Sequence, residues 1–409
     1  MHGQSIGIIG GGAAGFFAAI NLAEKTPETD ITILEKSQNV LTKVRISGGG
    51  RCNLTNTTTD TNSFLANYPR GQKELRSVFL THGSKNTIEW FESRGIKLKK
   101  EKDGRIFPSS NKSETIVDFF MRKSNQHKIK IIKNYPVSGV DKQGNSFCIN
   151  KDYENRLYFD KILVAIGGSK NTNAYEWIRN LNHKIVEPVP SLFTFNLTNS
   201  PFKGLEGVSI NNVSVKIADK KITQTGDLLF THTGLSGPVI LKLSAWEART
   251  LFELKYIFPL EINFLQDYNS ESARNILKEI KSTDRNKIIS KHTNHNLPLS
   301  FWQRIVMISG ISDNLKWTDV SNKLIECLAN NLTGLRIAVS GKSTNKEEFV
   351  TCGGVSLKDI NFKTMESKIC PGLYFAGEVL DIDALTGGFN FQSAWSTAYI
   401  AADSISKVL

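Results

Sequence analysis

The order of apolar and polar residues predicts a strand–helix–strand unit at the start of the chain. Residues 5–9 form a short apolar run typical of a buried strand, and residues 16–25 resemble a helix. A second apolar run at residues 31–34 predicts another buried strand. A glycine-rich turn separates the first strand from the helix. The length and order are those of a βαβ unit in a parallel sheet.

Beyond this unit, helical and strand-like stretches follow one another. The polar, glycine-rich segment 42–56 is expected to be a loop, and residues 97–107 alternate around a glycine turn as in a hairpin. The other expected helices are residues 72–95, 112–126, 270–330 and a last helix from about 392. The other expected strands lie within residues 128–166, 190–262, 335–357 and 372–376.

This order indicates a nested organisation. The chain has 409 residues, more than one compact core usually holds, so two or three domains are expected. The character changes near residue 188, and a strand, a glycine-rich loop and a helix return at the C-terminus. We therefore predict an α/β cofactor domain built from both ends of the chain, with the middle as an insertion.

The first motif with chemical meaning is Gly10-x-Gly12-x-x-Gly15 between the first strand and helix. Gly10 permits the tight turn, Gly12 lets the backbone approach a pyrophosphate, and Gly15 lets the helix pack closely on the strand. Glu35 ends the second strand, where a carboxylate can accept hydrogen bonds from a ribose diol. The motif predicts binding of FAD or NAD, and the acidic residue disfavours a 2′-phosphate.

The second motif is the segment 46–56, which contains three successive glycines followed by Arg51 and Cys52. The glycines allow a flat ligand to approach the backbone closely. Arg51 could offset negative charge developing on a reduced flavin. Cys52 has two interpretations, because it could donate a proton to substrate or simply pack as a small apolar residue.

Two further segments resemble cofactor contacts. Residues 163–168 form an apolar strand that ends in Gly167-Gly168. Residues 372–381 form another strand that ends in Ala-Gly-Glu, which can place the Glu378 carboxylate against a ribityl chain. Residues 386–394 then open a helix whose positive N-terminal dipole would stabilise negative charge on a flavin pyrimidine ring.

Together the segments 47–53, 226–238, 351–355, 365–368 and 388–390 resemble the BaiN/RdsA family of NAD(P)/FAD-dependent oxidoreductases over essentially the whole chain. The resemblance implies an FAD domain of the glutathione-reductase type, a β-barrel domain and a small helical domain inserted in the barrel. The implied domains are residues 1–188 with 352–409, residues 189–268 with 332–351, and residues 269–331. The implied FAD contacts are Gly10, Gly12, Ala13, Ala14, Gly15, Glu35, Lys36, Gly49, Arg51, Gly167, Gly377, Glu378, Asp381, Gly387, Gly388, Phe389, Asn390 and Phe391.

The resemblance implies several substrates. Related proteins have been linked to bile-acid reduction, to amine oxidation and to dihydrouridine formation in 23S ribosomal RNA. In the last case reduced FAD gives a hydride to the C5=C6 bond of a uridine, and an acid such as Cys52 or His232 supplies the proton, with Arg51 beside the flavin. Only one Gly-x-Gly-x-x-Gly occurs, so NAD(P)H would bind transiently over the flavin.

The net charge of +12 favours an anionic partner and makes ribosomal RNA our best estimate of the substrate. A solvated lysine-rich surface is the alternative interpretation. Two rival functions stay open: a small-molecule flavin oxidase or reductase, and an RNA-binding factor that holds flavin without turnover. The basic stretches Lys97–Arg105 and Lys278–Lys291 are the candidate phosphate contacts.

The cysteines, the histidines and the length of the apolar runs exclude several kinds of site and location. Five scattered cysteines with no Cys-x-x-Cys pair argue against a disulfide framework, a zinc site or dithiol chemistry. His292 and His295 lie three residues apart without an obvious completing ligand, so no metal is expected. No apolar run approaches the roughly 20 residues of a membrane span, and no signal peptide is recognised, so a cytoplasmic location is expected.

Overall fold

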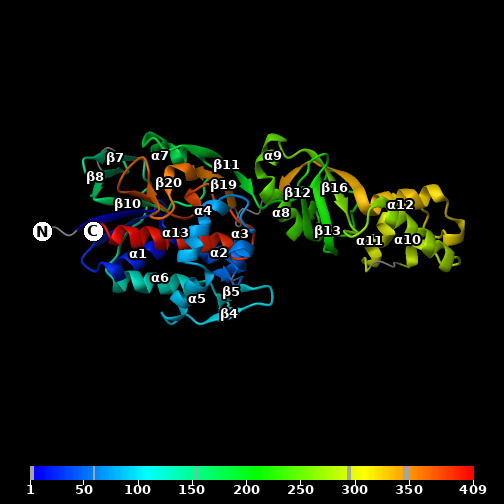
Figure 1. The fold of residues 1–409 in the computed structure, drawn as a ribbon, viewed down its shortest axis with the longest axis horizontal. Coiled ribbons are helices and arrows are strands. Elements are labelled where there is room, and N and C mark those ends of the chain that lie inside the picture. The colour runs from blue at the N-terminus through cyan, green and yellow to red at the C-terminus, as the bar shows by residue number, and fades with distance from the viewer. Residues whose placement is uncertain (1–3, 59, 153–154, 293–295, 344–349) are drawn as a thin grey trace. The chain divides into compact units, whose positions relative to one another are not determined.

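The computed structural model describes residues 4–58, 60–152, 155–292, 296–343 and 350–409. The chain forms two compact units, one comprising Met1–Ser191 with Lys346–Leu409 and the other Leu192–Asn345. The first unit therefore uses both ends of the chain, and the second is a continuous segment (Figure 1). The finer boundaries of the three domains implied by the family resemblance stay a prediction.

The first unit is organised around a seven-stranded sheet in the order β20-β21-β22-β10-β1-β2-β6. Its central strands are parallel, and β1 lies between β10 and β2, with Ile8 opposite both Leu163 and Ile33. Parallel strands need crossover connections, which here include helices that cover the sheet. The strands are β1 (Ser5–Ile9), β2 (Asp30–Leu34), β6 (Lys130–Ile132), β10 (Lys161–Val164), β20 (Ile360–Asn361), β21 (Glu366–Ser367) and β22 (Leu373–Phe375).

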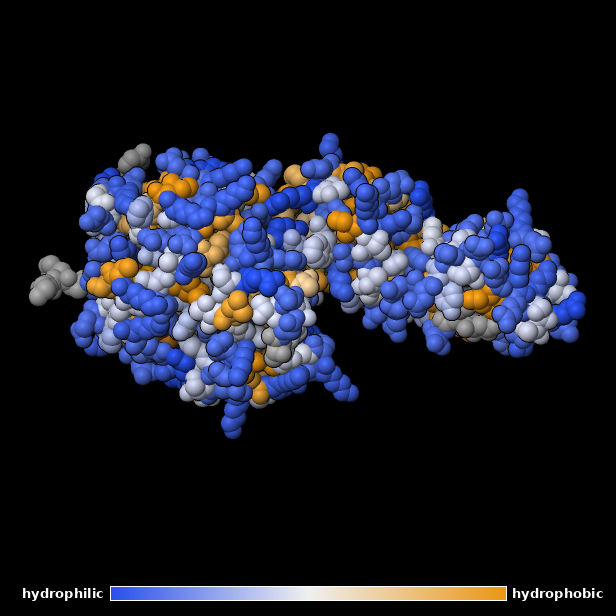
Figure 2. Space-filling view, viewed as in Figure 1, coloured by the Kyte–Doolittle hydropathy of each residue, from blue (hydrophilic) through white to orange (hydrophobic). Residues whose placement is uncertain are grey.

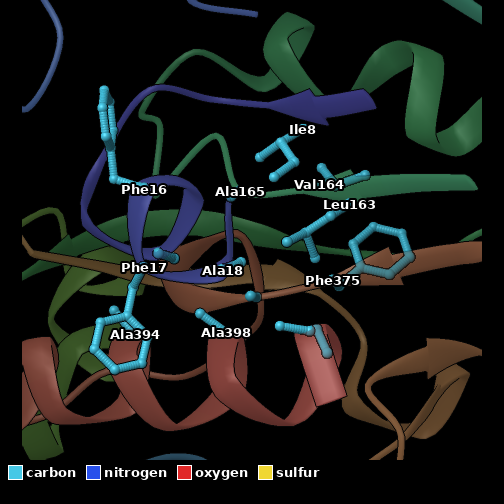
Figure 3. Packing of buried hydrophobic residues seen from close by; sticks show 14 of the residues in the cluster. Ile8, Phe16, Phe17, Ala18, Leu163, Val164, Ala165, Phe375, Ala394 and Ala398 are labelled. Carbon is cyan, nitrogen blue, oxygen red and sulfur yellow. The ribbon is translucent and has the colours of Figure 1, made fainter. Parts of the chain in front are cut away.

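Helix α1 (Ala13–Lys25) crosses from β1 to β2, and α13 (Phe389–Ser406) packs beside it. Both are buried over most of their length, α1 mainly through apolar residues and α13 through apolar residues together with small or hydrogen-bonded polar ones. Ala18 lies across from Ala394 and Ala398, and Phe17 points toward α13 (Figure 3). The Phe17 ring lies 5.3 Å from that of Trp395. Small residues bring the two helices close, and burying each large ring stabilises the packing by about 1.5–3 kcal/mol.

Smaller elements complete the first unit. Two three-stranded antiparallel sheets have the orders β3-β5-β4 and β7-β8-β9, and β11 pairs with β19. The strands are β3 (Thr55–Asn56), β4 (Leu98–Lys100), β5 (Arg105–Pro108), β7 (Gly139–Gln143), β8 (Ser146–Asn150), β9 (Arg156–Phe159), β11 (Ile185–Ser191) and β19 (Val350–Val355). The helices are α2 (Thr42–Gly50), α3 (Thr61–Leu65), α4 (Gln72–Thr81), α5 (Ser84–Glu92), α6 (Glu114–Gln126) and α7 (Glu176–Asn180).

Three element boundaries differ from the sequence-based prediction. The expected loop 42–56 begins with helix α2, which buries Val44 and becomes non-helical from Ser47. The expected helix 72–95 is two helices, because the chain breaks at His82 and Gly83. The last helix begins at Phe389 rather than near residue 392.

The second unit contains a seven-stranded sheet in the order β17-β16-β13-β14-β15-β12-β18. Its two end strands, β17 and β18, are separated along the chain only by Ser340, so the ends of the sheet meet as in a barrel. The strands are β12 (Thr194–Asn196), β13 (Ser209–Ile217), β14 (Thr223–Thr231), β15 (Gly234–Ser236), β16 (Phe258–Asn263), β17 (Leu335–Val339) and β18 (Gly341–Ser343).

Helices account for the rest of this unit. The expected helical stretch holds α10 (Ser270–Thr283), α11 (Leu299–Ile308) and α12 (Asn322–Gly334), which share a core around Trp302 and Leu328. Two helices that the alternation pattern missed are α8 (Pro238–Trp246) and α9 (Ala248–Glu253). Pro238 starts α8, where a missing N–H costs nothing. Within the part of the chain that the structure describes, every helix is too short or too polar to span a bilayer.

Candidate cofactor site

The turn from β1 into α1 has the shape that a nucleotide pyrophosphate requires. Gly10 has φ +118°, and a Cβ there would lie 2.3 Å from the Ala165 carbonyl oxygen. A Cβ on Gly15 would lie 2.0 Å from the Gly10 carbonyl oxygen. At Gly12, in contrast, no described atom lies within 4 Å of the Cβ position. Two glycines are thus needed by the protein itself, and the third leaves a space that a ligand can fill.

The N-terminus of α1 faces this space. The helix begins at Ala13, and its N-cap is Gly12, which has no side chain to accept from the first-turn N–H groups. The first turn carries no acidic residue. These N–H groups and the positive end of the helix dipole therefore favour an anion. Ala13 is half-buried, whereas Ala14 is buried beneath the turn.

Glu35 is held against the same turn. One oxygen of its carboxylate accepts from the Gly11 N–H at 2.9 Å, and the other accepts from the backbone N–H of Ser37 at 3.0 Å and its hydroxyl at 2.7 Å. The side chain is thereby fixed beside Gly11 at the end of β2, where a ribose diol could share it. Lys36 follows on the surface and is exposed.

The glycine segment after α2 presents backbone alone. Gly48, Gly49 and Gly50 all have positive φ, between +58° and +78°. The Cβ positions of Gly49 and Gly50 have no described atom within 4 Å, so both glycines border open space. Such a surface suits close contact with a flat ring system.

Arg51 lies at the end of this segment, but its charge already has a partner. Its guanidinium donates to the Glu101 carboxylate at 2.7 Å and stacks over the Phe107 ring, 4.1 Å from the centroid. About a third of the side chain is exposed. Arg51 is therefore a positioned cation beside the glycines.

Cys52 is fully buried and has φ +60°. Burial raises the pKa of its thiol to about 12, although a hydrogen bond with Ser47 opposes this shift. The thiol therefore stays protonated and inaccessible in this conformation. This favours the packing interpretation, and the proton-donor role stays a prediction.

The ends of β10 and β22 bring further predicted residues to the α1 turn. A Cβ on Gly377 would lie 3.2 Å from the Ala14 Cβ, so the Ala-Gly-Glu segment rests on the first turn of α1. A Cβ on Gly167 would be 4.0 Å from the Glu378 carboxylate. Glu378 also forms an ion pair with Lys43 of α2, which the sequence analysis did not single out.

The loop before α13 is held by polar contacts. The Asn390 amide donates to the Ala384 carbonyl and accepts from its N–H, both at 2.9 Å. Asn56 donates to the Gly387 carbonyl at 3.3 Å. A Cβ on Gly388 would lie 2.5 Å from the Thr55 carbonyl oxygen, so glycine is required there. Asn390 and Gly388 therefore shape the loop.

The other predicted residues around this loop make contacts within the protein. Phe389 is buried, and its carbonyl accepts from the Tyr68 hydroxyl at 2.6 Å. Phe391 is half-buried and stacks on Trp395 with centroids 5.5 Å apart. Asp381 is buried, and its N–H donates to the Val355 carbonyl at 3.0 Å.

Sequence reasoning missed the buried amide that anchors α13. Gln392 is fully buried, accepts from Thr55 at 2.6 Å, and donates to Thr87 and Ser396, each at 2.8 Å. A glutamine among the small residues of a buried helix was the available signal, since buried polar groups need partners. The network joins α13 to β3 and α5.

His232 lies in the second unit, in the turn between β14 and β15, and is exposed. The other predicted site residues all belong to the first unit, whereas His232 belongs to the second. Of the pair His292 and His295, the second lies outside the described residues.

Comparison with known proteins agrees with this geometry. A family model described as the HI0933-like protein Rossmann domain matches residues 4–404. The chain is 26% identical to the 3-dehydro-bile acid delta(4,6)-reductase of Clostridium scindens, covering 97% of each chain. It is 28% identical to the ribosomal RNA dihydrouridine synthase of Haemophilus influenzae, covering 98% of each.

Among solved structures, the 3-ketosteroid delta1-dehydrogenase of Sterolibacterium denitrificans matches with a TM-score of 0.50 and 11% identity, over the full length of both chains. At this identity the match shows a shared fold. The α/β fold with a Rossmann-type nucleotide unit, predicted from the sequence, is thereby confirmed.

Proposed function

The chain belongs to the HI0933-like Rossmann family, and from that membership we propose that it is an FAD-dependent oxidoreductase. The membership also confirms the family resemblance drawn from the motifs. The observation that carries the proposal is the open position beside Gly12 at the uncapped start of α1, with the Gly377–Glu378 turn resting on the same helix turn.

The residues present fit FAD. Gly10, Gly12 and Gly15 would admit the pyrophosphate, with the α1 N–H groups as donors, and Glu35 would accept from the adenosine ribose. The open backbone of Gly49 and Gly50 would face the ring system. When bound, FAD supplies hydride transfer, which no side chain offers.

We further propose that the reaction is an NAD(P)H-driven reduction of a C=C bond, with uridine in 23S ribosomal RNA as substrate. The full-length similarity to a ribosomal RNA dihydrouridine synthase supports this substrate, and so does the net charge of +12. In this role Arg51 holds positive charge beside the glycines. His232, being exposed, is the more accessible of the two candidate proton donors.

A second candidate is a reductase of a small steroid-like molecule. The observation that favours it is the full-length similarity to a 3-dehydro-bile acid reductase, at nearly the same identity. Both substrates require reduction of a C=C bond, so the cofactor site would serve either. The two candidates differ in the need for a polyanion-binding surface.

The deciding experiment compares modified nucleosides in ribosomal RNA from a strain lacking this gene and from its parent. Loss of one dihydrouridine, restored by the wild-type gene and not by a Gly12→Val gene, would establish the RNA function. In parallel, the purified protein is tested for RNA- and bile-acid-dependent NAD(P)H oxidation. An unchanged RNA profile with turnover of the bile acid would replace the first candidate by the second.

A further inference from the structure

The β4–β5 hairpin is a concentrated source of positive charge in the first unit. Residues 97–105 contain five cationic side chains and only two carboxylates, Glu101 and Asp103. Figure 2 shows hydrophilic side chains projecting from the edge of the unit where Figure 1 places this hairpin. The five cations are Lys97, Lys99, Lys100, Lys102 and Arg105.

One carboxylate serves three of the nearby cations. Glu101 lies 2.7 Å from Arg51, 3.1 Å from Arg105 and 3.7 Å from Lys99. The Arg51 and Arg105 guanidinium groups also share the Phe107 ring, at 4.1 and 5.5 Å from its centroid. Asp103 also pairs with Arg105, at 2.7 Å, so two carboxylates face three cations and the cluster keeps a net positive charge that attracts anions.

The other three lysines are available to an external partner. Lys97, Lys100 and Lys102 are exposed, and within the described ranges no carboxylate forms an ion pair with them. Lys97 and Lys100 are three residues apart along an extended chain, about 10 Å. Because successive side chains of an extended chain alternate in direction, these two lysines fall on opposite faces of the strand. Cations spread in this way over a hairpin suit several phosphates of one polymer better than a single phosphate group.

The hairpin is rigid and is attached to the candidate cofactor site. Glu101 and Arg105 pair through the backbone at 2.9 Å, and Thr57 donates to the Gly104 carbonyl at 2.8 Å. Strand β5 pairs with β3, whose Asn56 donates to the Gly387 carbonyl. The hairpin is therefore already ordered on the scaffold that also holds the loop before α13. An RNA that binds these cations loses little affinity to the ordering of protein backbone.

We propose that the β4–β5 hairpin is the surface that holds the backbone phosphates of the RNA substrate, with Lys97, Lys100 and Lys102 as direct contacts. This inference rests on the proposed RNA function. It assigns the hairpin a binding role while Arg51, through Glu101 and Phe107, connects this surface to the glycine segment of the cofactor site.

The test is the triple variant Lys97→Gln, Lys100→Gln, Lys102→Gln. Its matched control is Lys220→Gln, Lys221→Gln, Lys255→Gln in the second unit, which removes the same number of positive charges at exposed positions outside both basic stretches. Binding of an unmodified 23S ribosomal RNA transcript is measured between about 50 and 200 mM salt. Flavin content and thermal melting verify that both variants are folded.

We expect the hairpin variant to bind RNA roughly tenfold to hundredfold more weakly than wild type. The slope of log binding constant against log salt concentration should become shallower by about 0.7 per lost contact. The control variant should keep an affinity and a slope near those of wild type. If the wild type binds RNA and the hairpin variant matches the control, the hairpin assignment is overturned and the proposed function stands. If the wild type itself shows no RNA binding, the proposed RNA function fails, and the hairpin assignment fails with it.

Discussion

Arg70 and Asp383, 313 residues apart in the sequence, form a two-pronged buried ion pair. The Asp383 side chain is fully buried, and that of Arg70 is 13% exposed. Asp383 also accepts from the Ser191 hydroxyl at 2.7 Å. The pair joins the segment before α4 to the loop before α13, so it fixes the loop that carries the predicted flavin contacts.

Removal of Arg70 should strongly destabilise the first unit. Arg70→Ala leaves a buried carboxylate with its partner gone, at a cost of about 3–5 kcal/mol in the free energy of unfolding. Chemical denaturation measures this, with exposed Arg76→Ala as a control expected to stay within about 0.5 kcal/mol. Equal stability of the two variants would contradict the importance of the pair.

The same variant should lose stability as pH rises from the acidic range. Burial raises the pKa of Asp383, and Arg70 opposes that shift. Without Arg70 the folded-state pKa rises further above the unfolded value of about 3.9, so stability is retained at low pH and lost as pH rises through the folded pKa. The deficit of Arg70→Ala relative to wild type should therefore be smaller near pH 5 than near pH 8.

Gly12→Val should separate folding from cofactor binding. Gly12 has φ −96°, which valine also adopts, and the added side chain enters the open position. The protein should fold but lose FAD affinity by about 1–3 kcal/mol or more, tenfold to hundredfold in Kd. Absorbance of the purified protein reports bound flavin. Gly334→Val, another open position, is the control and should keep its flavin.

Cys52→Ala and His232→Asn distinguish the two candidate proton donors. Because Cys52 is buried, its replacement should cost about 1 kcal/mol of stability and leave turnover nearly unchanged. Loss of a general acid lowers turnover by about 10²–10⁴-fold, which we expect for His232→Asn. The rate at which substrate reoxidises the reduced flavin in a single turnover measures the effect of each substitution on the chemical step. A loss of that size in Cys52→Ala alone would restore Cys52 as the donor.

His82 should contribute an acid-sensitive part of the stability. Burial, and secondarily the charge of Arg94, lower its pKa to about 4. Its ring stacks on Tyr399 at 4.2 Å, and its Nε2 has no partner among the described atoms. Burial favours the neutral imidazole in the folded state. His82 therefore contributes up to about 3 kcal/mol to the free energy of unfolding above its unfolded pKa of about 6.5, and this contribution is lost as pH falls toward 4.

The variant His82→Phe keeps an aromatic ring in place and removes the titration. Its stability should fall less than that of wild type between about pH 7 and pH 4.5, as measured by denaturant unfolding. His292→Phe, at an exposed position, serves as the control and should follow the wild-type profile. Parallel pH profiles for all three proteins would contradict the assignment.

The nucleotide unit could be read from the sequence because its requirements are local. Gly15 is needed because its Cβ would meet the Gly10 carbonyl oxygen in the same turn, and Gly10 because the turn gives it a φ of +118°, so the motif carries much of its own geometry. The contacts of Gln392 with Thr55 and Thr87 depend on segments some 300 residues away, which periodicity does not report. The burial of Cys52 is likewise tertiary, because a small residue after three glycines fits an exposed or a buried position equally well.

Helix α8 shows a second reason why the sequence pattern did not predict every element. Its sequence from Pro238 to Trp246 is short and apolar, and such a run does not distinguish a strand from a buried helix. The start of the helix depends on Gly237, where φ is +94° and a Cβ would lie 2.6 Å from the Asp227 carbonyl oxygen. The backbone must turn there, and the proline then begins the helix.

The pairing of β11 with β19 has a consequence for how such a protein can diversify. Ser191 and Val350 are register partners, so the chain departs from the first unit and rejoins it at neighbouring points. Everything between them is topologically a single cassette, which recombination could exchange or trim without rerouting any strand of the parallel sheet. One nucleotide-binding scaffold could thus acquire new specificities through replacement of one continuous stretch of gene.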